Sequence, residues 1–546
     1  MKNDWLKKIE KILIVIFIFL GIVAAGGILW MLYQEKNETE DRPETEMETE
    51  ELEKAEYSWE DGLSDRTLWI PDNCAEYEKF PEVYVTDADG KRQRLNDYFT
   101  RPTVVIFWAG WCEDCQQQMS HMTDFMEIAK EYGDVQFLFI NKTDGAKETR
   151  ESADTYFSEL GIHAELFYDE GLEAYQTLGM HNIPTTFFID QEGRLIDCSP
   201  SQITENGIFE AYLLNLVKGK SCATENFVLA ELLDEEGGLH STYAAGEKEK
   251  TQQSPVLSES QGLLLQYAAA TENQELFRQI TDYIKNHMLA EKGLTAWTVT
   301  EEESSPVNAL LDDLRIYSAI VRAEEQWGGY EELRNDYQQR IYTYGIQKGQ
   351  YVDFYDSSTK KKARRLTLCY IDLVTMKQLA AQEETFQNAC DKAEKILAEG
   401  QISKEFPLYY SAYDYKSHRY LKDDLNMAEA MVTILHLAEN GSLPEETAEW
   451  LRKSMAADGI KARYTVEGEA VEGYQYDSTA VYALVVQIAD ILEDDTLRDQ
   501  ALRKMEKLRI NNAAAAYNGA FGMEDGTGIT SFDQLLPLLT YEILEK

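Results

Sequence analysis

A pair of cysteines stands between a short apolar run and a segment with helical periodicity. Residues 104–108 are apolar, and Cys112 and Cys115 follow them closely. From residue 116 to 132, apolar side chains recur at the spacing of a helix. Two thiols this close at the end of a buried strand can close into one small ring, which makes a reversible two-electron switch. The pattern predicts a strand, a turn and a helix, with Cys112 at the N-terminus of the helix.

A thiol at that position is activated by its surroundings. Unpaired N–H groups and the helix dipole favour thiolate over thiol, and the pKa of such a cysteine can fall from ~8.5 towards ~7 or lower. The alternative is half of a zinc site, which would need further ligands at close spacing. The nearest histidine, His121, is expected on the helix surface. Redox chemistry without a metal or other cofactor is therefore the favoured interpretation.

Two stretches of this region resemble a known family. Residues 107–115 resemble the active-site motif of thioredoxin-fold proteins, and residues 183–190 resemble their cis-proline loop and the strand after it. The similarity covers residues of about 75–218. It is nearest to the membrane-anchored, extracytoplasmic thiol–disulfide oxidoreductases, whose partners are protein thiols or disulfides.

The resemblance implies roles for individual residues. Cys112 is the attacking thiol, Cys115 resolves the mixed disulfide, and Pro184 is the cis-proline that faces them. Glu113 is the available proton acceptor, and Trp111 is expected to contact the substrate. The direction of electron flow and the reduction potential stay open.

The length, net charge and cysteine content of the chain limit its domain number, its partners and its disulfides. With 546 residues, it is too long for one ordinary core, so two or three domains are expected. Its formal net charge of −46 disfavours nucleic acid as a partner. Seven cysteines in so long a chain do not form a disulfide scaffold. Pairing among Cys74, Cys198 and Cys222 stays open, and Cys369 and Cys390 are expected to be buried in helices.

The N-terminal segment predicts attachment to the cell membrane. Residues 12–33 form a run of 22 residues without a charge, and a helix needs ~20 to cross a bilayer. Lysines precede the run and acidic residues follow it, which places the N-terminus in the cytoplasm and both later domains outside. A cleaved signal peptide with its site at residues 24–26 is the alternative. Residues 35–56 are acidic and almost without apolar groups, which is typical of a disordered spacer.

From about residue 222 the pattern becomes helical. Apolar stripes at helical spacing predict many packed amphipathic helices. Three such stripes are Leu310, Leu314, Tyr317 and Val321; Leu425, Ala428, Val432 and Leu435; and Val481, Leu484, Val485 and Ile488. Loops rich in Tyr, Trp, Asp and Gly lie between them. Sugar rings stack on aromatic faces and their hydroxyls bind carboxylates, so we expect a helical toroid whose mouth binds a polysaccharide.

A second resemblance begins in this region. Residues of about 225–546 resemble glycoside hydrolase family 8, an (α/α)6 barrel of inverting β-glycan hydrolases, at residues 258–262, 313–316 and 473–478. The resemblance implies Glu259 as general acid and Asp477 as general base. An inverting enzyme needs two such carboxyls ~6.5–9.5 Å apart, with water activated by one of them.

The same resemblance implies contacts to sugar from Trp297, Asp313, Tyr370 and Tyr476. Leu311 stands where the family has the first Asp of an Asp-x-Asp helix start. The chain therefore supports two hypotheses for this part. One is a hydrolase of a β-linked polysaccharide, and the other is a catalytically inactive glycan-binding or scaffolding module that localises the redox domain.

The predicted architecture is an α/β thioredoxin fold followed by an all-α (α/α)6 toroid, with an N-terminal transmembrane helix. The expected parts are a cytoplasmic N-terminus and anchor over residues 1–34, an acidic linker over 35–66, the thioredoxin-like domain over 67–220 and the glycoside hydrolase-like domain over 221–546.

Overall fold

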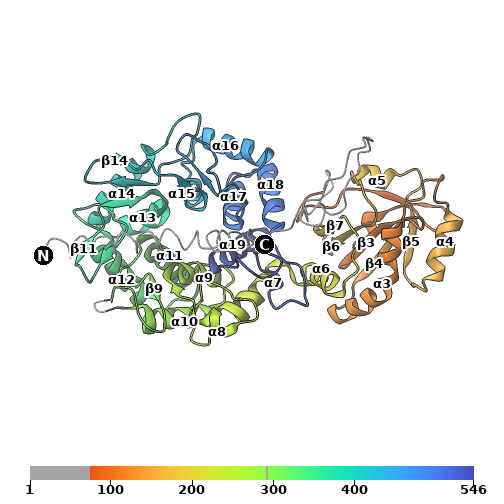
Figure 1. Ribbon diagram of the computed structural model, residues 1–546, viewed down its shortest axis with the longest axis horizontal. Coiled ribbons are helices and arrows are strands. Elements are labelled where there is room, and N and C mark those ends of the chain that lie inside the picture. The colour runs from red at the N-terminus through yellow and green to blue at the C-terminus, as the bar shows by residue number, and fades with distance from the viewer. Residues whose placement is uncertain (1–73, 291–292, 546) are drawn as a thin grey trace, which may run out of the picture. The chain divides into compact units, whose positions relative to one another are not determined.

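The computed structural model describes residues 74–290 and 293–545 (Figure 1). The predicted transmembrane run at residues 12–33 and the acidic linker lie outside the described residues. Among the residues that are described, no helix is both long enough and apolar enough to cross a membrane.

The first domain is built on a seven-stranded sheet with the order β2-β1-β5-β4-β3-β6-β7. Strands β3, β4 and β5 are parallel, whereas β6 and β7 run antiparallel to their neighbours. The strands are β1 (Tyr84–Thr86), β2 (Arg92–Arg94), β3 (Thr103–Trp108), β4 (Gln136–Asn141), β5 (Glu165–Tyr168), β6 (Thr185–Ile189) and β7 (Leu195–Ser199). The helices are α3 (Glu113–Ala129), α4 (Arg150–Glu159), α5 (Glu173–Thr177) and α6 (Asn206–Lys218), with short turns η1 (Leu95–Tyr98) and η2 (Lys130–Tyr132).

The central strand β3 is buried over its whole length. Val104 and Ile106 point into one apolar cluster with residues of α3 and α6, while Val105 and Phe107 point into a second cluster on the other face. A strand covered on both faces is apolar at every position rather than at alternate ones. This explains the continuous apolar run in the sequence, and it confirms the predicted strand and helix on either side of the cysteines.

The second domain is largely helical. Its helices are α7 (Lys220–Phe227), α8 (Lys248–Gln253), α9 (Ser258–Ala270), α10 (Gln274–Tyr283), α11 (Leu310–Trp327), α12 (Glu331–Arg340), α13 (Leu373–Ala380), α14 (Glu384–Ala398), α15 (Met427–Glu439), α16 (Glu445–Ala456), α17 (Thr479–Ile491), α18 (Asp495–Glu506) and α19 (Ser531–Leu544). Short turns are η3 (Val228–Leu232), η4 (Ile284–Met288), η6 (Ile341–Gly345) and η7 (Leu368–Tyr370).

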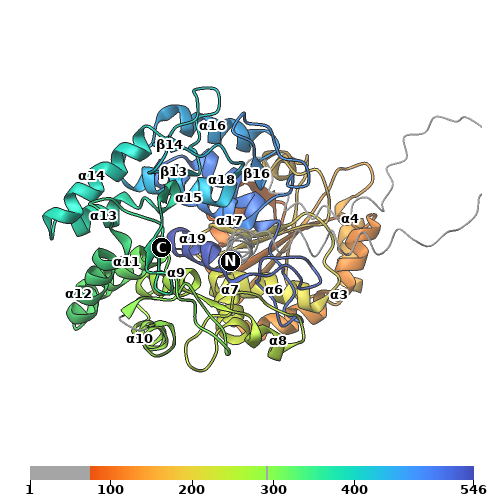
Figure 2. The same ribbon diagram turned by 60° about the vertical axis from the view of Figure 1, so that its left-hand side comes forward.

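Six of the helices described here form a closed inner ring. In the order α9, α11, α13, α15, α17 and α19, each packs on the next, and α19 packs back on α9. The helices between them in sequence lie outside this ring, as Figures 1 and 2 show. This arrangement is the helical toroid that the sequence predicted, and one large apolar core joins its helices.

Short strands precede several inner helices and pair with one another. They are β8 (Val256–Leu257) with β9 (Thr298–Val299), β10 (Tyr355–Asp356) with β11 (Lys361–Lys362), β12 (Arg365–Thr367) with β13 (Ala412–Asp414) and β14 (Arg419–Tyr420), and β15 (Leu425–Asn426) with β16 (Arg463–Tyr464). The helical pattern of the sequence predicted no strands in this part. Because these strands join the segments that lead into inner helices, the N-termini of those helices lie at the same end of the ring.

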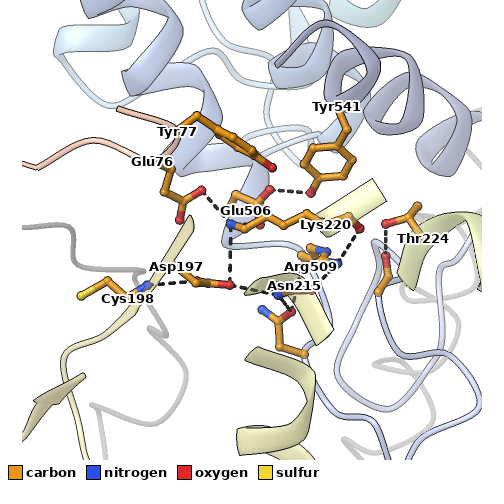
Figure 3. Close-up of polar contacts among 12 residues, drawn as sticks. Glu76, Tyr77, Asp197, Cys198, Asn215, Lys220, Thr224, Glu506, Arg509 and Tyr541 are labelled. Atoms are coloured by element: carbon orange, nitrogen blue, oxygen red, sulfur yellow. Dashed lines mark hydrogen bonds and ion pairs between the residues drawn. The ribbon is translucent and has the colours of Figure 1, made fainter. Parts of the chain in front are cut away.

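A buried polar cluster joins the two domains (Figure 3). The Lys220 Nζ lies 2.7 Å from Glu76 Oε2, 3.1 Å from Glu506 Oε2 and 3.8 Å from Asp197 Oδ2, and all four side chains are fully buried. Asp197 belongs to β7 of the first domain, whereas Glu506 ends α18 of the second. Burying a charge is costly unless it is paired, so these ion pairs hold β7 and α18 together. No local sequence pattern predicts that these residues meet, because they are far apart along the chain.

Arg509 adds a second cation to this cluster. Its Nη2 donates to Asn215 Oδ1 at 3.1 Å and to the Lys220 carbonyl oxygen at 2.9 Å. The Asn215 side chain in turn donates to Asp197 Oδ2 at 2.9 Å. Burial alone would lower the pKa of Lys220, but the surrounding carboxylates outweigh it and the net shift is upward. The lysine is therefore charged at neutral pH.

Candidate active sites

Cys112 is the N-cap residue of α3. Strand β3 ends at Trp108, a tight turn follows, and the backbone N–H of Cys115 donates to Cys112 Sγ at 3.4 Å. This places Cys112 at the N-terminus of α3, as the sequence predicted. Cys112 is 9% exposed, whereas Cys115 is fully buried.

The proline loop lies against the same sulfur. The Ile183–Pro184 peptide bond is cis, and the Cys112 thiol lies 3.5 Å from the Ile183 carbonyl oxygen. Strand β6 begins at the next residue and pairs with β3, which ends before the cysteines. The two segments that resemble the thioredoxin motif therefore meet in space, although about seventy residues separate them.

Cys115 is the inner thiol. Its side chain is fully buried, and burial together with the contact to Cys112 raises its pKa far above the usual value for a thiol. A buried thiol with a raised pKa is a poor nucleophile toward a partner in solution.

Two further predicted residues lie at the rim of this site. Glu113 is exposed in the first turn of α3. Trp111 is 43% exposed, and the ammonium group of Lys147 lies 4.5 Å from the centre of its ring. An exposed indole beside a reactive sulfur is suited to contact a partner protein.

Glu148 anchors the turn before the cysteines, and it was not predicted from the sequence. Its carboxylate is 2% exposed and accepts hydrogen bonds from the N–H groups of Gly110, at 2.8 Å, and Trp111, at 3.3 Å. The Ser152 hydroxyl donates to its other oxygen at 2.9 Å. A β-carbon at Gly110 would lie only 3.2 Å from this carboxylate, so the glycine makes room for it.

In the helical domain, Glu259 lies in the first turn of α9 and meets an arginine from the neighbouring helix α11. Arg315 Nη1 lies 3.2 Å from Glu259 Oε1 and 3.9 Å from Asp312 Oδ1. The Ser258 hydroxyl donates to Asp312. Burial, with the nearby charge of Glu259, raises the pKa of Asp312 to about 7. Asp312 lies in the first turn of α11. Neither Asp312 nor Arg315, which stands within the motif at residues 313–316, was predicted as a functional residue.

Asp313 and Trp297, which were both predicted to contact sugar, lie in different surroundings. Asp313 is buried and accepts a hydrogen bond from the Asn308 side chain at 2.7 Å, and burial raises its pKa to about 6. Trp297 is half-buried, and its carbonyl oxygen accepts a hydrogen bond from Ser258 N at 2.9 Å. The tryptophan thus lies beside the start of α9, where Glu259 is located.

Asp477 precedes α17 and has two partners. The Tyr482 hydroxyl donates to its Oδ1 at 2.5 Å, and Lys461 Nζ lies 3.8 Å from the same oxygen. Tyr476 beside it is 45% exposed, with the ring of Tyr474 at 6.3 Å. Exposed rings of this kind can stack on sugars.

Glu429 is a carboxyl that the sequence analysis did not name. It lies in the first turn of α15 and is half-buried. Burial, followed by repulsion from Glu259, raises its pKa to about 7. Tyr370, a predicted sugar contact, is half-buried in η7, and the negative charges of Asp312 and Glu429 act on its hydroxyl. The first-turn acids of α9, α11 and α15 thus share one region.

The other cysteines are free thiols in this structure. Cys74, Cys198, Cys369 and Cys390 are buried, and Cys222 is half-buried. The buried state of Cys369 and Cys390 confirms the prediction made from their helical context.

Comparisons with known proteins support both domains. The AhpC/TSA family matches residues 77–197. Thiol-disulfide oxidoreductase ResA of Bacillus anthracis is 28% identical over 133 residues, which cover 24% of this chain and 73% of that protein. The first domain is therefore an AhpC/TSA-type, thioredoxin-like domain related to ResA.

Other proteins match a longer part of the chain than the first domain. YdaJ of Bacillus subtilis (strain 168), whose name classes it provisionally as a lipoprotein, is 26% identical over 322 residues, or 58% of this chain and 84% of that protein. An alpha-amylase from Clostridium perfringens superposes with a TM-score of 0.55 at 28% identity, covering 59% of this chain and 97% of its own. The endoglucanase Cel10 of Klebsiella pneumoniae, a family 8 glycosyl hydrolase, matches with a TM-score of 0.40 and 14% identity over 53% of this chain and 100% of its own.

Proposed function

We propose that this chain, a ResA-related thioredoxin-like domain joined to a helical domain with the fold of family 8 glucanases, is an extracytoplasmic thiol–disulfide oxidoreductase that also acts on a polysaccharide. The observation that carries the redox half is Cys112 at the N-cap of α3, beneath the cis Pro184 loop and in front of the buried Cys115. The membrane anchor predicted at residues 12–33 would hold both domains outside the cell.

The exchange reaction follows from this geometry. The Cys112 thiolate attacks one sulfur of a partner disulfide, a mixed disulfide forms, and the other partner sulfur leaves as a thiolate. Cys115 then loses its proton and attacks Cys112, which releases the second partner sulfur and leaves an internal disulfide. Glu113 is the proposed proton acceptor for that step, and Trp111 offers an apolar surface to the partner protein.

An insulin-reduction assay on the full chain tests this reaction. Cys112→Ser is expected to abolish exchange, because Cys115, the other thiol of the site, is fully buried. Cys115→Ser is expected to retain the first attack and to accumulate mixed disulfides that a non-reducing gel detects. Cys222→Ser, which changes a half-buried thiol elsewhere, is the control and should exchange at the rate of the unchanged protein. Unaltered exchange by Cys112→Ser would overturn the assignment.

For the helical domain we propose hydrolysis of a β-linked polysaccharide with inversion. The observation that supports it is Glu259 at the start of α9, next to Trp297 and facing the acids of neighbouring helices. Glu259 would donate a proton to the leaving oxygen, and Asp477 is the base that the sequence pattern indicates. The similarity to an alpha-amylase makes an α-glucan the alternative substrate.

Release of reducing sugar from β-glucan, xylan, chitosan and amylose tests this half. We expect release from at least one of them, and loss of ~10²–10⁴-fold in rate for Glu259→Gln, the range for removal of a general acid. Binding without release would favour the second candidate, a glycan-binding module without turnover. Leu311, in the place of a family carboxylate, is the observation that favours that candidate.

A further inference from the structure

The loop that follows β4 lies beside the turn that carries the reactive cysteine. Strands β3 and β4 are parallel neighbours, with Trp108 opposite Asn141 where both strands end. The segments that leave two parallel neighbours start at the same edge of the sheet. Residues 142–149 therefore run next to residues 109–112, and hydrogen bonds join the two segments directly.

This loop is held in one shape by its own hydrogen bonds. One carboxylate oxygen of Asp144 accepts hydrogen bonds from three backbone N–H groups, those of Ala146 at 2.9 Å, Lys147 at 2.7 Å and Glu148 at 3.1 Å. Thr149, the next residue, caps helix α4. A carboxylate that binds successive N–H groups in this way fixes a turn. The side chains of Lys147 and Glu148 therefore leave the loop from defined positions.

Lys147 and Glu148 hold Trp111 at two different points. Glu148 is buried and binds the backbone, because its Oε2 accepts hydrogen bonds from Gly110 N at 2.8 Å and from Trp111 N at 3.3 Å. Lys147 acts on the side chain, since its Nζ lies 4.5 Å from the centre of the Trp111 ring. A cation within about 6 Å of an indole ring is attracted to its face, and indole attracts cations more strongly than the other aromatic side chains do. The ammonium group therefore covers one face of the ring.

The ring that is held in this way stands next to the sulfur that performs the exchange. Trp111 directly precedes Cys112, and it is 43% exposed although the strand before it is buried over its whole length. A side chain that is fixed before a partner arrives loses less conformational entropy when the complex forms. An apolar side chain beside the disulfide of a partner would meet this ring as the partner sulfur approaches Cys112.

We propose that Lys147 is a positioning residue that sets the specificity of the exchange reaction. It holds the Trp111 ring as a platform for an apolar side chain that flanks the disulfide of the partner protein. The inference rests on the proposed exchange function and names the class of partner that its site favours. Lys147 takes no part in the covalent step, which remains the attack of Cys112 on the partner disulfide.

Two disulfides of different size test this role in the full chain. Insulin is a protein substrate, whereas hydroxyethyl disulfide is neutral and carries no apolar side chain beside its sulfurs. The measured quantity is the ratio of kcat/KM for insulin to kcat/KM for the small disulfide, with a dithiol as electron donor. In Lys147→Met this ratio should fall ~2–5-fold, which is the effect of an exposed cation–π contact. The fall should come mainly from a higher KM for insulin.

Matched variants show whether the ring carries the effect. Lys147→Arg keeps a cation that stacks on indole, so it should keep the ratio of the unchanged protein. Trp111→Ala should lower the ratio ~10-fold, and adding Lys147→Met to it should lower the ratio no further. Arg92→Met is the control, because it removes a guanidinium whose carbon lies 3.8 Å from the ring centre of Tyr84, at the edge of the sheet that is far from the site. Its ratio should equal that of the unchanged protein.

A pair of peptide disulfides tests the class of partner. The two peptides are identical except for the residue beside one cysteine, which is leucine in one and serine in the other. The unchanged protein should prefer the leucine peptide ~5-fold, the effect of removing ~40 Å² of apolar area from water. This preference should shrink in Lys147→Met and disappear in Trp111→Ala.

Three results would overturn the inference. The first is an unchanged ratio in Lys147→Met, the second is a fall of the same size with and without the Trp111 ring, and the third is equal rates for the two peptides. Both rates scale with the amount of folded protein, so the ratio does not report a loss of folding. The proposed exchange function fails by a different result, namely that Cys112→Ser exchanges both disulfides at the rate of the unchanged protein.

Discussion

At the scale of single residues, Glu148 shows how a buried carboxylate shapes a redox site without touching either sulfur. It accepts hydrogen bonds from the two N–H groups that open the turn before Cys112. These donors lie in a part-buried turn, where an unpaired N–H costs more than a hydrogen bond contributes. Glu148 therefore holds the turn that sets the position of Cys112, and it comes from a loop after β4, far along the chain.

Replacing Glu148 tests this role. Glu148→Ala should lower the free energy of unfolding of the first domain by ~1–3 kcal/mol, because two N–H groups lose their acceptor. Glu148→Gln retains one acceptor oxygen and should lose less. Urea unfolding followed by tryptophan fluorescence measures both. Glu159→Ala, at an exposed position near the end of α4, is the control. If this variant loses as much free energy of unfolding as Glu148→Ala, the hydrogen bonds of Glu148 do not have this role.

At the scale of elements, the inner helices position the acids of the helical domain. Several of them begin with a side-chain cap: Asp372 caps α13, Asn426 caps α15, Ser478 caps α17 and Thr530 caps α19. A cap fixes where the first turn starts, and a carboxyl in that turn is fixed with it. The dipole of each helix also favours the ionised form of an acid at this end.

The cap of α15 can be compared with that of an outer helix. Asn426→Ala removes the acceptor for Ala428 N, and Asn273→Ala removes the acceptor for Leu276 N in α10. Each variant should lose ~0.5–2 kcal/mol of stability by chemical denaturation. Only Asn426→Ala should also reduce polysaccharide hydrolysis, because α15 belongs to the inner ring whose N-termini carry the acids, whereas α10 lies outside that ring. An equal loss of hydrolysis in Asn273→Ala would show that stability alone governs activity.

At the scale of the whole molecule, the buried cluster around Lys220 makes the two domains depend on each other. Three carboxylates, those of Glu76, Asp197 and Glu506, meet the two cations Lys220 and Arg509. Because the acids outnumber the cations, one acid is expected to hold a proton. Burial is the main cause that raises the pKa of Glu76, from 4.5 to about 8, and the attraction of Lys220 opposes it.

This shift predicts a pH dependence of stability. Between the unfolded pKa of 4.5 and the folded pKa of about 8, the folded state binds a proton that the unfolded state has released. The free energy of unfolding should therefore fall as pH rises through that window, by up to ~1.4 kcal/mol per pH unit from this one group. In Glu76→Gln the side chain stays neutral, so the slope of stability against pH should be flatter.

Thermal and urea unfolding from pH 5 to pH 9 measure this slope. Glu78→Gln changes a neighbouring carboxylate that is about half exposed and pairs with Arg498, and it serves as the control. The slope of the control should match that of the unchanged protein. If Glu76→Gln and the unchanged protein have the same slope, Glu76 is not the group that carries the proton.

Much of this protein was open to prediction from its sequence, because local patterns decide local structure. The apolar run before Cys112 and the helical spacing after it predicted β3, the turn and α3, and the resemblance at residues 183–190 predicted the proline loop beside the sulfur. Apolar stripes every few residues predicted the helical domain. In each case the signal lies within ten or twenty neighbouring residues. Over that length, an element buried on one face has apolar residues at regular spacing, and a strand buried on both faces is apolar throughout.

Only the tertiary structure decided which charged side chains meet when they are distant in sequence. The ion pair of Glu259 with Arg315, the repulsion between Glu259 and Glu429, and the buried cluster of Lys220 with Glu76, Asp197 and Glu506 left no pattern along the chain. A carboxylate has the same appearance in a sequence whether it is solvated or buried. Its pKa and its role depend on which charges the fold places within a few ångströms of it.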